Sequence, residues 1–558
     1  MHFPLFGLVS PFCTNLRVLE TRHVIKTEGY EDSSLADDIE SGFDLVGDAP
    51  KSSVLPAKVV PASISKHDLG RHAEKANVAL RYMTRSCGDS SLDIQLWERT
   101  IQEVDKGWLV GPLCWDELPS NASVSRRFPL PQSGKVRPID DLSPSQVNAT
   151  VSTYEQATVD GPDVICSLAV YLMKCLSANG RSTKLVGRSL DLASAYRQLA
   201  ISDESLPHSY LSVFDPVESR AALFQQIALP FGSRTAVNAF IRCARFLQWV
   251  AARCLALPLS CYFDDFVAFS TTSLGQNTQA ALCLMLDIFG WRFDKEGPKS
   301  DDFSDLVSAL GVQFNLSDTP SGILQVCNTE KRIKDIIQLL NETLEAGILP
   351  KKDALSLRGR LAFCDAFVFG RLGKVSLQDI TKHAYAKPFV AELGDRLVGA
   401  LKLLKNRVLT GGPRTLSCKM LDTYFLFTDA SFSLAAGAGF GAVLVSSAGE
   451  IISWFGLMVD TRSLALFLDG GKQNIIGELE TLTVGMSLLL WGDIVSSSQL
   501  MIYIDNEGAK FSLIRGYSDS LAITSICALT ATALDKFFIL PWFSRVPTTA
   551  TVGIKFNQ

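Results

Sequence analysis

The stretch CYFDDFVAFS, residues 261–270, places two adjacent aspartates, Asp264 and Asp265, between apolar flanks. Aromatic and β-branched residues around a short polar break predict a strand, a tight turn and a second strand. Two carboxylates in an otherwise apolar hairpin repel each other and are costly to desolvate unless a cation neutralises them. An isolated Asp-Asp pair is more often a simple turn, so a functional interpretation depends on the rest of the chain.

Length and composition bound the possibilities. The 558 residues are enough for roughly three or four domains, and a composition that is 47% hydrophobic and 20% charged is ordinary for a globular protein. The net charge of −5 gives no global basic field that draws the chain to nucleic acid, so such binding depends on local patches. Thirteen scattered cysteines without a C-x-x-C motif, and only six histidines, argue against a zinc site and against a disulfide framework.

The same cysteine usage favours a reducing compartment, so we expect an intracellular protein, cytoplasmic or nuclear. No uncharged apolar run is long enough to span a membrane. The apolar start MHFPLFGLVSPFC lacks a basic leader and is broken by Pro4 and Pro11, so we expect no signal peptide.

The N-terminal region is predicted in two parts. Residues 27–50 carry eight acidic residues and neither lysine nor arginine. Such a composition is typical of disorder, and we expect an acidic, disordered segment over residues 1–64. Helical spacing at residues 68–84 and 91–106 then predicts a helical region over residues 65–125.

A basic strand follows. In residues 126–151 the tripeptide Gln-Ser-Gly at 132–134 is a hairpin signal, and alternation places Lys135 and Arg137 on one face of the next strand. Two cations on one face could hold a triphosphate, with Arg137 making bidentate hydrogen bonds. A solvated surface strand is the alternative, which this motif alone favours.

A third aspartate ends another predicted strand. The segment SLDLASAYRQLAI, residues 189–201, predicts a strand that ends at Asp191, with Tyr196 five residues later. A lone aspartate here is usually a turn or helix-capping residue. Asp264 lies 73 residues further on, which leaves room for a helix and for a second strand to return beside Asp191.

The segment between these aspartates is ALPFGSRTAVNAFIRCARFLQWVAARC. Pro230 and Gly232 break the chain, and Ser233 can cap a helix that runs to about Cys254. Gly232 also permits close approach of the backbone to a ligand. A buried amphipathic helix would account for the apolar positions but leaves the Leu-Pro-Phe-Gly entry unexplained.

After the Asp-Asp hairpin we expect a helix at residues 276–289 and a strand at 306–316, with a bulge or close approach at Gly311. Between them, Lys295 and Lys299 lie near the expected cleft.

Residues 328–407 have a helical pattern and the opposite charge balance. They contain fifteen lysines and arginines and nine acidic residues, a local net charge of +6. A basic helical region in an acidic protein predicts contact with a duplex backbone. Ordinary solvated helix faces are the alternative.

The C-terminal part contains a second candidate metal site. Strands at 424–432 and 500–505 end in Asp429 and Asp505, and the helix at 475–491 carries Glu478 and Glu480. A hairpin at 437–459, turning at Ala448-Gly449, lies between the first strand and the helix. The expected order is strand, strand, strand, helix, strand, helix.

Taken together, these segments resemble the reverse transcriptases of retroelements. KVRPIDD resembles the basic fingers strand, SLDLASAY the motif of the first catalytic aspartate, LPFGSRTAVNAF the nucleotide-packing motif and YFDD the catalytic hairpin. This resemblance covers roughly residues 108–318. Residues 424–518, with TDAS, the LE helix and YIDN in order, resemble a retroelement ribonuclease H. The tandem is most similar to retrotransposons that encode a tyrosine recombinase, and to related eukaryotic elements.

The resemblance implies an α+β, multidomain fold. Fingers and palm would occupy residues 126–327, a basic helical thumb or connection 328–410, and a ribonuclease H-like mixed α/β domain 420–545. That family usually has a fourth acidic residue on its last helix, whereas this chain ends in FSRVPTTATVGIKFNQ. The last domain is therefore expected to be truncated, which leaves its hydrolytic activity open.

The resemblance also implies residue roles. Asp191, Asp264 and Asp265 would be catalytic and would hold two Mg²⁺ or Mn²⁺ ions. The nucleotide-binding residues would be Lys135, Arg137, Tyr196, Phe231, Gly232 and Lys299, with Tyr196 excluding a 2′-hydroxyl. In the second domain the metal ligands would be Asp429, Glu480 and Asp505, with Glu478 as the alternative to Glu480.

The implied function is an RNA-directed DNA polymerase that adds deoxynucleotides to a primer 3′-hydroxyl, with a possible ribonuclease H activity. The implied partners are an RNA template, a DNA primer, an RNA/DNA hybrid and deoxynucleoside triphosphates, with no membrane; the oligomeric state stays open. Two alternatives remain: an RNA-directed RNA polymerase, and a decayed or host-adopted retroelement protein that binds nucleic acid without catalysis.

Overall fold

The computed structural model describes residues 16–132, 134–293, 302–419, 421–433, 437–459 and 474–545. The chain forms two compact units, Met1–Ala169 with Thr183–Leu310, and Val170–Ser182 with Gly311–Gln558. None of the described helices combines the length and the apolar character needed to cross a membrane.

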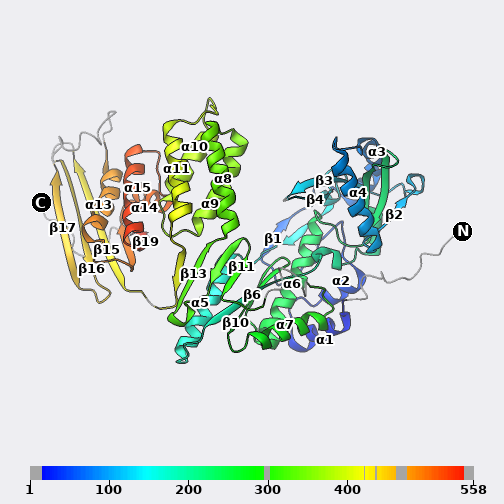
Figure 1. The fold of residues 1–558 in the computed structure, drawn as a ribbon, viewed down its shortest axis with the longest axis horizontal. Helices are drawn as coiled ribbons and strands as arrows, with labels where there is room; N and C mark the ends of the chain where they lie inside the picture. Colours follow the sequence, from blue (N-terminus) through cyan, green and yellow to red (C-terminus); the bar gives the residue numbers. More distant parts are fainter. Residues whose placement is uncertain are drawn as a thin grey trace. The chain divides into compact units, whose positions relative to one another are not determined.

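The elements up to residue 310 are labelled in Figure 1 where space allows. In chain order they are α1 (Val18–Glu28), α2 (Leu35–Ser41), β1 (Ala57–Val60), α3 (Lys66–Met83), α4 (Ser90–Asp105), β2 (Leu109–Leu113), η1 (Trp115–Glu117), β3 (Val124–Gln132), β4 (Lys135–Asp141), η2 (Val147–Thr150), β5 (Thr153–Glu155), α5 (Pro162–Ala178), β6 (Leu185–Asp191), η3 (Ala195–Gln198), η4 (Asp203–His208), β7 (Tyr210–Asp215), β8 (Arg220–Gln226), α6 (Arg234–Leu255), β9 (Leu259–Tyr262), β10 (Asp265–Thr271), α7 (Gly275–Ile288) and β11 (Leu306–Ala309).

Besides the two-stranded sheet β1-β5, two sheets organise the first unit. The larger has the strand order β2-β8-β7-β3-β4, and the smaller has the order β6-β10-β9 with both neighbours antiparallel to β10. Helix α6 begins where the Ser233 hydroxyl accepts a hydrogen bond from the Ala236 amide, as predicted for its N-cap. Its apolar face packs in the same buried cluster as Phe266 and Ala268 of β10. The smaller sheet is thus backed by the longest helix of the unit.

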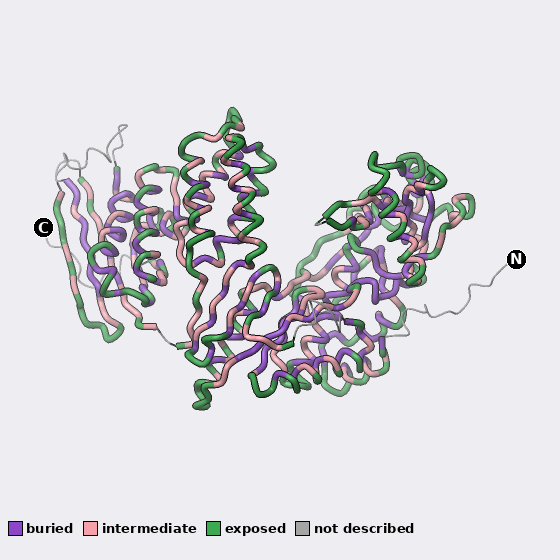
Figure 2. The backbone as a smooth tube through the Cα atoms, viewed as in Figure 1, coloured by how far each residue is buried: buried purple, intermediate pink, exposed green. Residues whose placement is uncertain are grey.

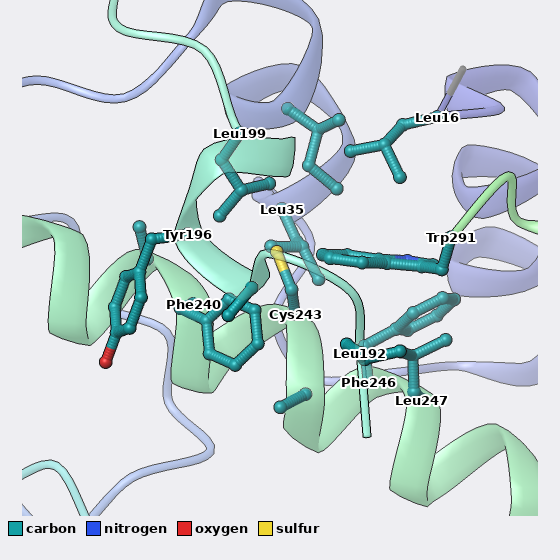
Figure 3. Close-up of a cluster of buried hydrophobic side chains, with 14 of the residues drawn as sticks. Leu16, Leu35, Leu192, Tyr196, Leu199, Phe240, Cys243, Phe246, Leu247 and Trp291 are labelled. Carbon is teal, nitrogen blue, oxygen red and sulfur yellow. The ribbon is translucent and has the colours of Figure 1, made fainter. Parts of the chain in front are cut away.

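Residues 16–64 form helices, a strand and packed loops, so the disorder predicted for residues 1–64 is wrong for this part, whereas residues 1–15 lie outside the described residues. Leu35, Phe43 and Leu45 are buried in the same cluster as α6. Figure 3 shows labelled members of this cluster from the N-terminal segment (Leu16, Leu35), from α6 (Phe240, Cys243, Phe246, Leu247) and from other segments (Leu192, Tyr196, Leu199, Trp291).

Two acidic side chains of this segment pair with an arginine from far along the chain. The Arg242 guanidinium, only 1% exposed, donates to both carboxylate oxygens of Asp32 at 2.7 and 2.8 Å, and it also lies 2.7 Å from Asp38. Arg242 is 210 residues away from Asp32 in sequence. A local count of charges could not include this partner, which is why composition predicted disorder.

Replacing Asp32 with alanine leaves the buried Arg242 with Asp38 as an ion-pair partner. We expect the free energy of opening of α6 to fall by about 3 kcal/mol, the lower end of the range for breaking a buried ion pair. Hydrogen exchange of the α6 amides measures this. Asp37→Ala is the matched control, because Asp37 pairs with Arg22 at the surface and should lose much less. Equally small losses in both variants would exclude the buried pair as the anchor of the segment.

From residue 311 the elements belong to the second unit. They are β12 (Val312–Asn315), η5 (Thr319–Ser321), β13 (Ile323–Asn328), α8 (Glu330–Ala346), α9 (Lys351–Ala366), α10 (Gly373–Ala384), α11 (Asp395–Thr410), β14 (Arg414–Ser417), β15 (Thr423–Ser433), β16 (Gly437–Val445), β17 (Ile451–Val459), α13 (Ile476–Trp491), β18 (Gln499–Ile504), α14 (Glu507–Arg515), α15 (Leu521–Lys536) and β19 (Leu540–Arg545).

Four helices, α8 to α11, form the basic region that was predicted to be helical. Leu340, Leu361 and Leu401 are fully buried among them, so the apolar faces meet and the lysines and arginines are left mainly outside. Figure 1 shows the four helices gathered in one bundle (green to yellow).

The C-terminal sheet has the strand order β17-β16-β15-β18-β19. β17, β16 and β15 pair antiparallel, whereas β18 and β19 continue from β15 in parallel. Residues of α13 and α15 share a buried cluster with the sheet, and Figure 2 shows the buried central strands beside the largely exposed edge strand β17. This confirms the predicted order of three strands, a helix, a strand and a helix.

The strand predicted over residues 306–316 is two strands, β11 and β12. Leu310 and Gly311 between them have φ angles of 52° and 69°, which end the extended conformation. A Cβ on Gly311 would lie 2.0 Å from the Arg332 guanidinium, so the predicted close approach at this glycine is confirmed. The helices predicted at 68–84, 91–106, 276–289 and 475–491 are found as α3, α4, α7 and α13.

Candidate functional site

The Asp-Asp pair lies in a tight hairpin, as predicted. Tyr262 of β9 pairs with Asp265 of β10, which leaves Phe263 and Asp264 as a two-residue turn. Phe263 has a φ of 52°, a conformation that such hairpin turns require and that a bulky side chain rarely adopts.

The same hairpin brings the third aspartate close. Asp265 is the direct cross-strand partner of Asp191 on β6, and the Leu192 amide donates to the Asp264 carbonyl at 3.2 Å. Residues directly opposite on antiparallel strands have their Cβ atoms about 4.5–5.5 Å apart. All three aspartates are half-buried. The fold therefore gathers carboxylates that are 73 residues apart in sequence at one end of the smaller sheet.

Tyr196 lies next to this group. Burial, with a further contribution from the charge of Asp264, raises the pKa of Tyr196 to about 12. The ring centroid of Tyr196 lies 4.9 Å from that of Phe231 and 4.9 Å from that of Phe240. Phe240 is fully buried and Phe231 is exposed. Tyr196 thus stands between the core and the surface, beside Asp264.

The Gly232 conformation ties the Phe231 loop to the basic strand. Gly232 has a φ of 96°, and a Cβ there would lie 2.9 Å from the Asp140 carbonyl oxygen of β4. The side-chain amide of Asn148 donates to the Gly232 carbonyl at 2.9 Å and accepts from the Arg234 amide at 2.9 Å. Sequence reasoning identified Gly232 but missed Asn148, because no local pattern connects residues so far apart.

Lys135 and Arg137 lie on β4, within the predicted hairpin. Both side chains are exposed and Val136 between them is buried, so the two cations share one face of the ribbon as predicted. Gln132 pairs with Lys135 across the turn. Both cations are thus presented to solvent near the tip of the ribbon.

A buried ion network holds this ribbon, and no local sequence pattern indicated it. Arg127 of β3 donates to Asp140 of β4 at 2.7 and 3.1 Å, and both Arg127 and Arg197 reach Glu103 of α4 at 3.0 Å. Arg197, the residue after Tyr196, also lies 3.3 Å from Asp140. Burial alone would raise the pKa of Asp140, but the two arginines hold it below its usual value. The network therefore connects α4, the ribbon and the Tyr196 turn.

The second unit contains a separate acidic group. The carboxylate oxygens of Asp429 on β15, Glu480 on α13 and Asp505, which follows β18, all lie within 4.8 Å of one another. Among the described residues, this is the one group of metal-ligand side chains with such a spacing. The carboxylate oxygens of Asp191, Asp264 and Asp265 do not all lie within 4.8 Å of one another.

The acidic group suits a divalent cation. Glu480 is 1% exposed; its Oε1 accepts from the Ala430 amide at 3.1 Å, and its Oε2 is buried without a hydrogen-bond partner. Burial, and then the charges of Asp505 and Asp429, raise the pKa of Glu480 to about 9. An orphaned oxygen in an all-carboxylate group fits Mg²⁺ or Mn²⁺. Glu478 points elsewhere, since its Oε1 accepts from the Ser520 hydroxyl at 2.9 Å.

This raised pKa predicts a pH-dependent stability. Without a cation, the folded protein keeps a proton on Glu480 between about pH 4.5 and pH 9 that the unfolded chain releases, so its stability falls as pH rises through this window. At pH 8 we expect Mg²⁺ to raise the Tm of the wild type, and Glu480→Gln to raise the metal-free Tm and remove the Mg²⁺ response. Calorimetry from pH 5 to 9 measures both effects. An unchanged wild-type Tm with Mg²⁺ at pH 8 would rule out ion binding by this group.

Two predictions fall outside the described residues. Lys295 and Lys299 lie in the segment 294–301, and the expected C-terminal truncation concerns residues 546–558.

No protein-family model and no curated protein matches this sequence. Similar solved structures include the foamy viral protease-reverse transcriptase dRH with double-stranded DNA, at a TM-score of 0.46 and 13% identity over 98% of this chain and 83% of that one. The foamy viral protease-reverse transcriptase with double-stranded DNA gives 0.44 and 14% over 98% and 99%, and its complex with an RNA/DNA hybrid gives 0.43 and 10% over 98% and 85%. TM-scores this low do not bear on the activity.

Proposed function

We propose that this protein is an RNA-directed DNA polymerase, a reverse transcriptase, that adds deoxynucleotides to a primer 3′-hydroxyl. The observation that carries the proposal is the pairing of Asp265 with Asp191 on neighbouring strands, with Asp264 in the adjoining turn. In the resemblance to retroelement reverse transcriptases, these three positions are the catalytic aspartates. Residues 126–327 would then be the fingers and palm, and residues 328–410 the thumb or connection.

The three aspartates offer only oxygen ligands and are half-buried, which suits Mg²⁺ or Mn²⁺ completed by substrate phosphates and water. Two such ions held there would supply an activated 3′-hydroxyl and a stabilised leaving pyrophosphate. The turn conformation at Phe263 and the bond from Leu192 to Asp264 keep the hairpin beside β6, so the backbone positions of the three aspartates would be fixed before substrate binds.

The surrounding residues support binding of a deoxynucleoside triphosphate. Lys135 and Arg137 present two cations on one exposed face, where they would neutralise the β- and γ-phosphates as charge develops. Tyr196, fixed between Phe231 and Phe240, would stack under the sugar and leave no room for a 2′-hydroxyl. Phe231 and Gly232 would pack against the incoming base and the template. Lys299 would add a third cation.

The helical region supports a duplex partner. A pocket of about 510 Å³ is lined mainly by residues of α8 and α9, which include the cations Lys331, Arg332 and Arg360 and one carboxylate, that of Asp335. The Arg332 guanidinium lies 4.0 Å from the ring centroid of Phe363, and its Nη1 is buried without a hydrogen-bond partner. Three cations in one concave surface suit the phosphates of a nucleic-acid backbone.

The C-terminal domain would be a ribonuclease H-like nuclease. The group of Asp429, Glu480 and Asp505 supports this part of the proposal, because three clustered carboxylates can hold the ions that hydrolyse a phosphodiester. The proposed activity of this domain is cleavage of the RNA strand of an RNA/DNA hybrid.

Primer extension on an RNA template tests the proposal. With Mg²⁺, we expect extension by deoxynucleotides but not by ribonucleotides, followed by loss of the RNA strand. Efficient ribonucleotide incorporation would replace the proposal with an RNA-directed RNA polymerase. Hybrid binding without any extension, by a protein that circular dichroism shows to be folded, would favour the non-catalytic, decayed or host-adopted protein.

A further inference from the structure

The strand that leads into the Asp-Asp turn is held from outside its sheet. β9 is an edge strand, paired with β10 on one side only and four residues long. On its other side, the Asp160 amide donates to the Cys261 carbonyl at 2.9 Å, and the Cys261 amide donates to Asp160 Oδ2 at 3.0 Å. Asp160 thus bonds to both the backbone amide and the backbone carbonyl of Cys261 on the free edge of β9.

Asp160 is itself fixed by helix α6. Arg245 Nη1 donates to Asp160 Oδ1 at 2.9 Å, and Gln248 Nε2 donates to Asp160 Oδ2 at 2.6 Å. Gln248 Nε2 also donates to the Leu259 carbonyl at 3.0 Å, so the same amide reaches the start of β9. Asp160 is 7% exposed, and charge-assisted bonds of this kind are about twice as strong as neutral ones.

These bonds act close to the aspartates. Cys261 lies three residues before Asp264, and its thiol lies 3.5 Å from the carbonyl oxygen of Phe263 in the turn. A shift of one residue in strand register turns every side chain to the opposite face. In a four-residue edge strand few ladder bonds oppose such a shift, so the bonds from Asp160 contribute a large share of the restraint.

We propose that Asp160, held by Arg245 and Gln248, is a positioning residue that fixes the register of the Asp-Asp hairpin. It acts through the Cys261 backbone and does not touch substrate. The expected fall in kcat rests on the proposed polymerase function. The expected loosening of the hairpin can be measured without any activity.

The test uses the full-length chain carrying Asp160→Ala, with Asp163→Ala as the matched control because Asp163 is exposed three residues further on. For Asp160→Ala we expect hydrogen–deuterium exchange in peptides covering residues 259–266 to accelerate at least about tenfold. We expect kcat for primer extension to fall about 10- to 100-fold and the Mg²⁺ concentration for half-maximal rate to rise, with an unchanged Kd for template-primer. Asp163→Ala should match the wild type in each measurement.

Gln248→Ala provides a milder variant that keeps Asp160 and Arg245 in case Asp160→Ala does not fold. It should show the same pattern with smaller changes. Unchanged exchange and unchanged kcat in a folded Asp160→Ala protein would overturn the inference, and so would a fall in template-primer affinity as large as the fall in kcat. A wild type that does not extend a primer would instead count against the proposed function, and the exchange measurement would still decide whether Asp160 restrains the hairpin.

Discussion

Asp264→Asn is expected to lower the rate of primer extension by at least about 1,000-fold and to leave template-primer affinity essentially unchanged. Asparagine keeps the size of the side chain, and the backbone bond from Leu192 to residue 264 is unaffected. The variant loses one negative charge from the group that would bind the ions, which removes several kcal/mol of transition-state stabilisation, each 1.36 kcal/mol being about tenfold in rate. Single-turnover extension and fluorescence anisotropy measure the two quantities.

Asp203→Asn is the control for this variant. Asp203 is an exposed residue of η4 in the same unit, so its loss of charge should change neither rate nor affinity. Extension by Asp264→Asn at a rate near that of the wild type would contradict the assignment of the catalytic aspartates. A matching loss of affinity would mean that Asp264 supports the fold or the nucleic-acid surface instead of the chemistry.

Glu480→Gln is expected to lower the rate at which the RNA strand of a hybrid is cleaved by at least about 100-fold. Glu478→Gln should retain most of the wild-type rate. The two glutamates lie two residues apart on α13 and both are buried, so they form a closely matched pair. Only Glu480 joins Asp429 and Asp505, because Glu478 bonds to Ser520. A gel assay with labelled RNA in a preformed hybrid measures cleavage.

Primer extension by both variants is the internal control and should equal that of the wild type, because the aspartate hairpin belongs to the other unit. The reverse result, with Glu478→Gln inactive and Glu480→Gln active, would transfer the ligand role to Glu478. Hybrid binding without RNA loss in the wild type would leave this domain a binding module.

The hairpin at residues 261–270 could be predicted from sequence because its signals are local. Aromatic and β-branched flanks, a polar break and the two-residue turn all lie within ten positions. The N-cap at Ser233 and the shared face of Lys135 and Arg137 are similarly local, since capping and strand alternation act over three residues or fewer.

The features that the sequence predicted wrongly or did not reveal depend on contacts between residues far apart in the chain. The N-terminal segment was predicted to be disordered because the partner of Asp32 lies 210 residues away. The ion network of Arg127, Asp140 and Arg197 joins separate elements, so no local spacing predicts that the three side chains meet. The choice between Glu478 and Glu480 also needed the helix orientation, which shows one turned to Ser520 and the other to Asp429.

The pairing of Asp32 with Arg242 has a consequence for folding during synthesis of the chain. A ribosome adds about 5–20 residues per second, so the acidic segment is synthesised roughly 10–40 s before its arginine. During that time Leu35 and Leu45 have no α6 to cover them. The C-terminal sheet differs, because β15, β16 and β17 pair with their neighbours in sequence as they emerge. Synthesis speed and chaperone supply should therefore limit the yield of the first unit more than that of the second.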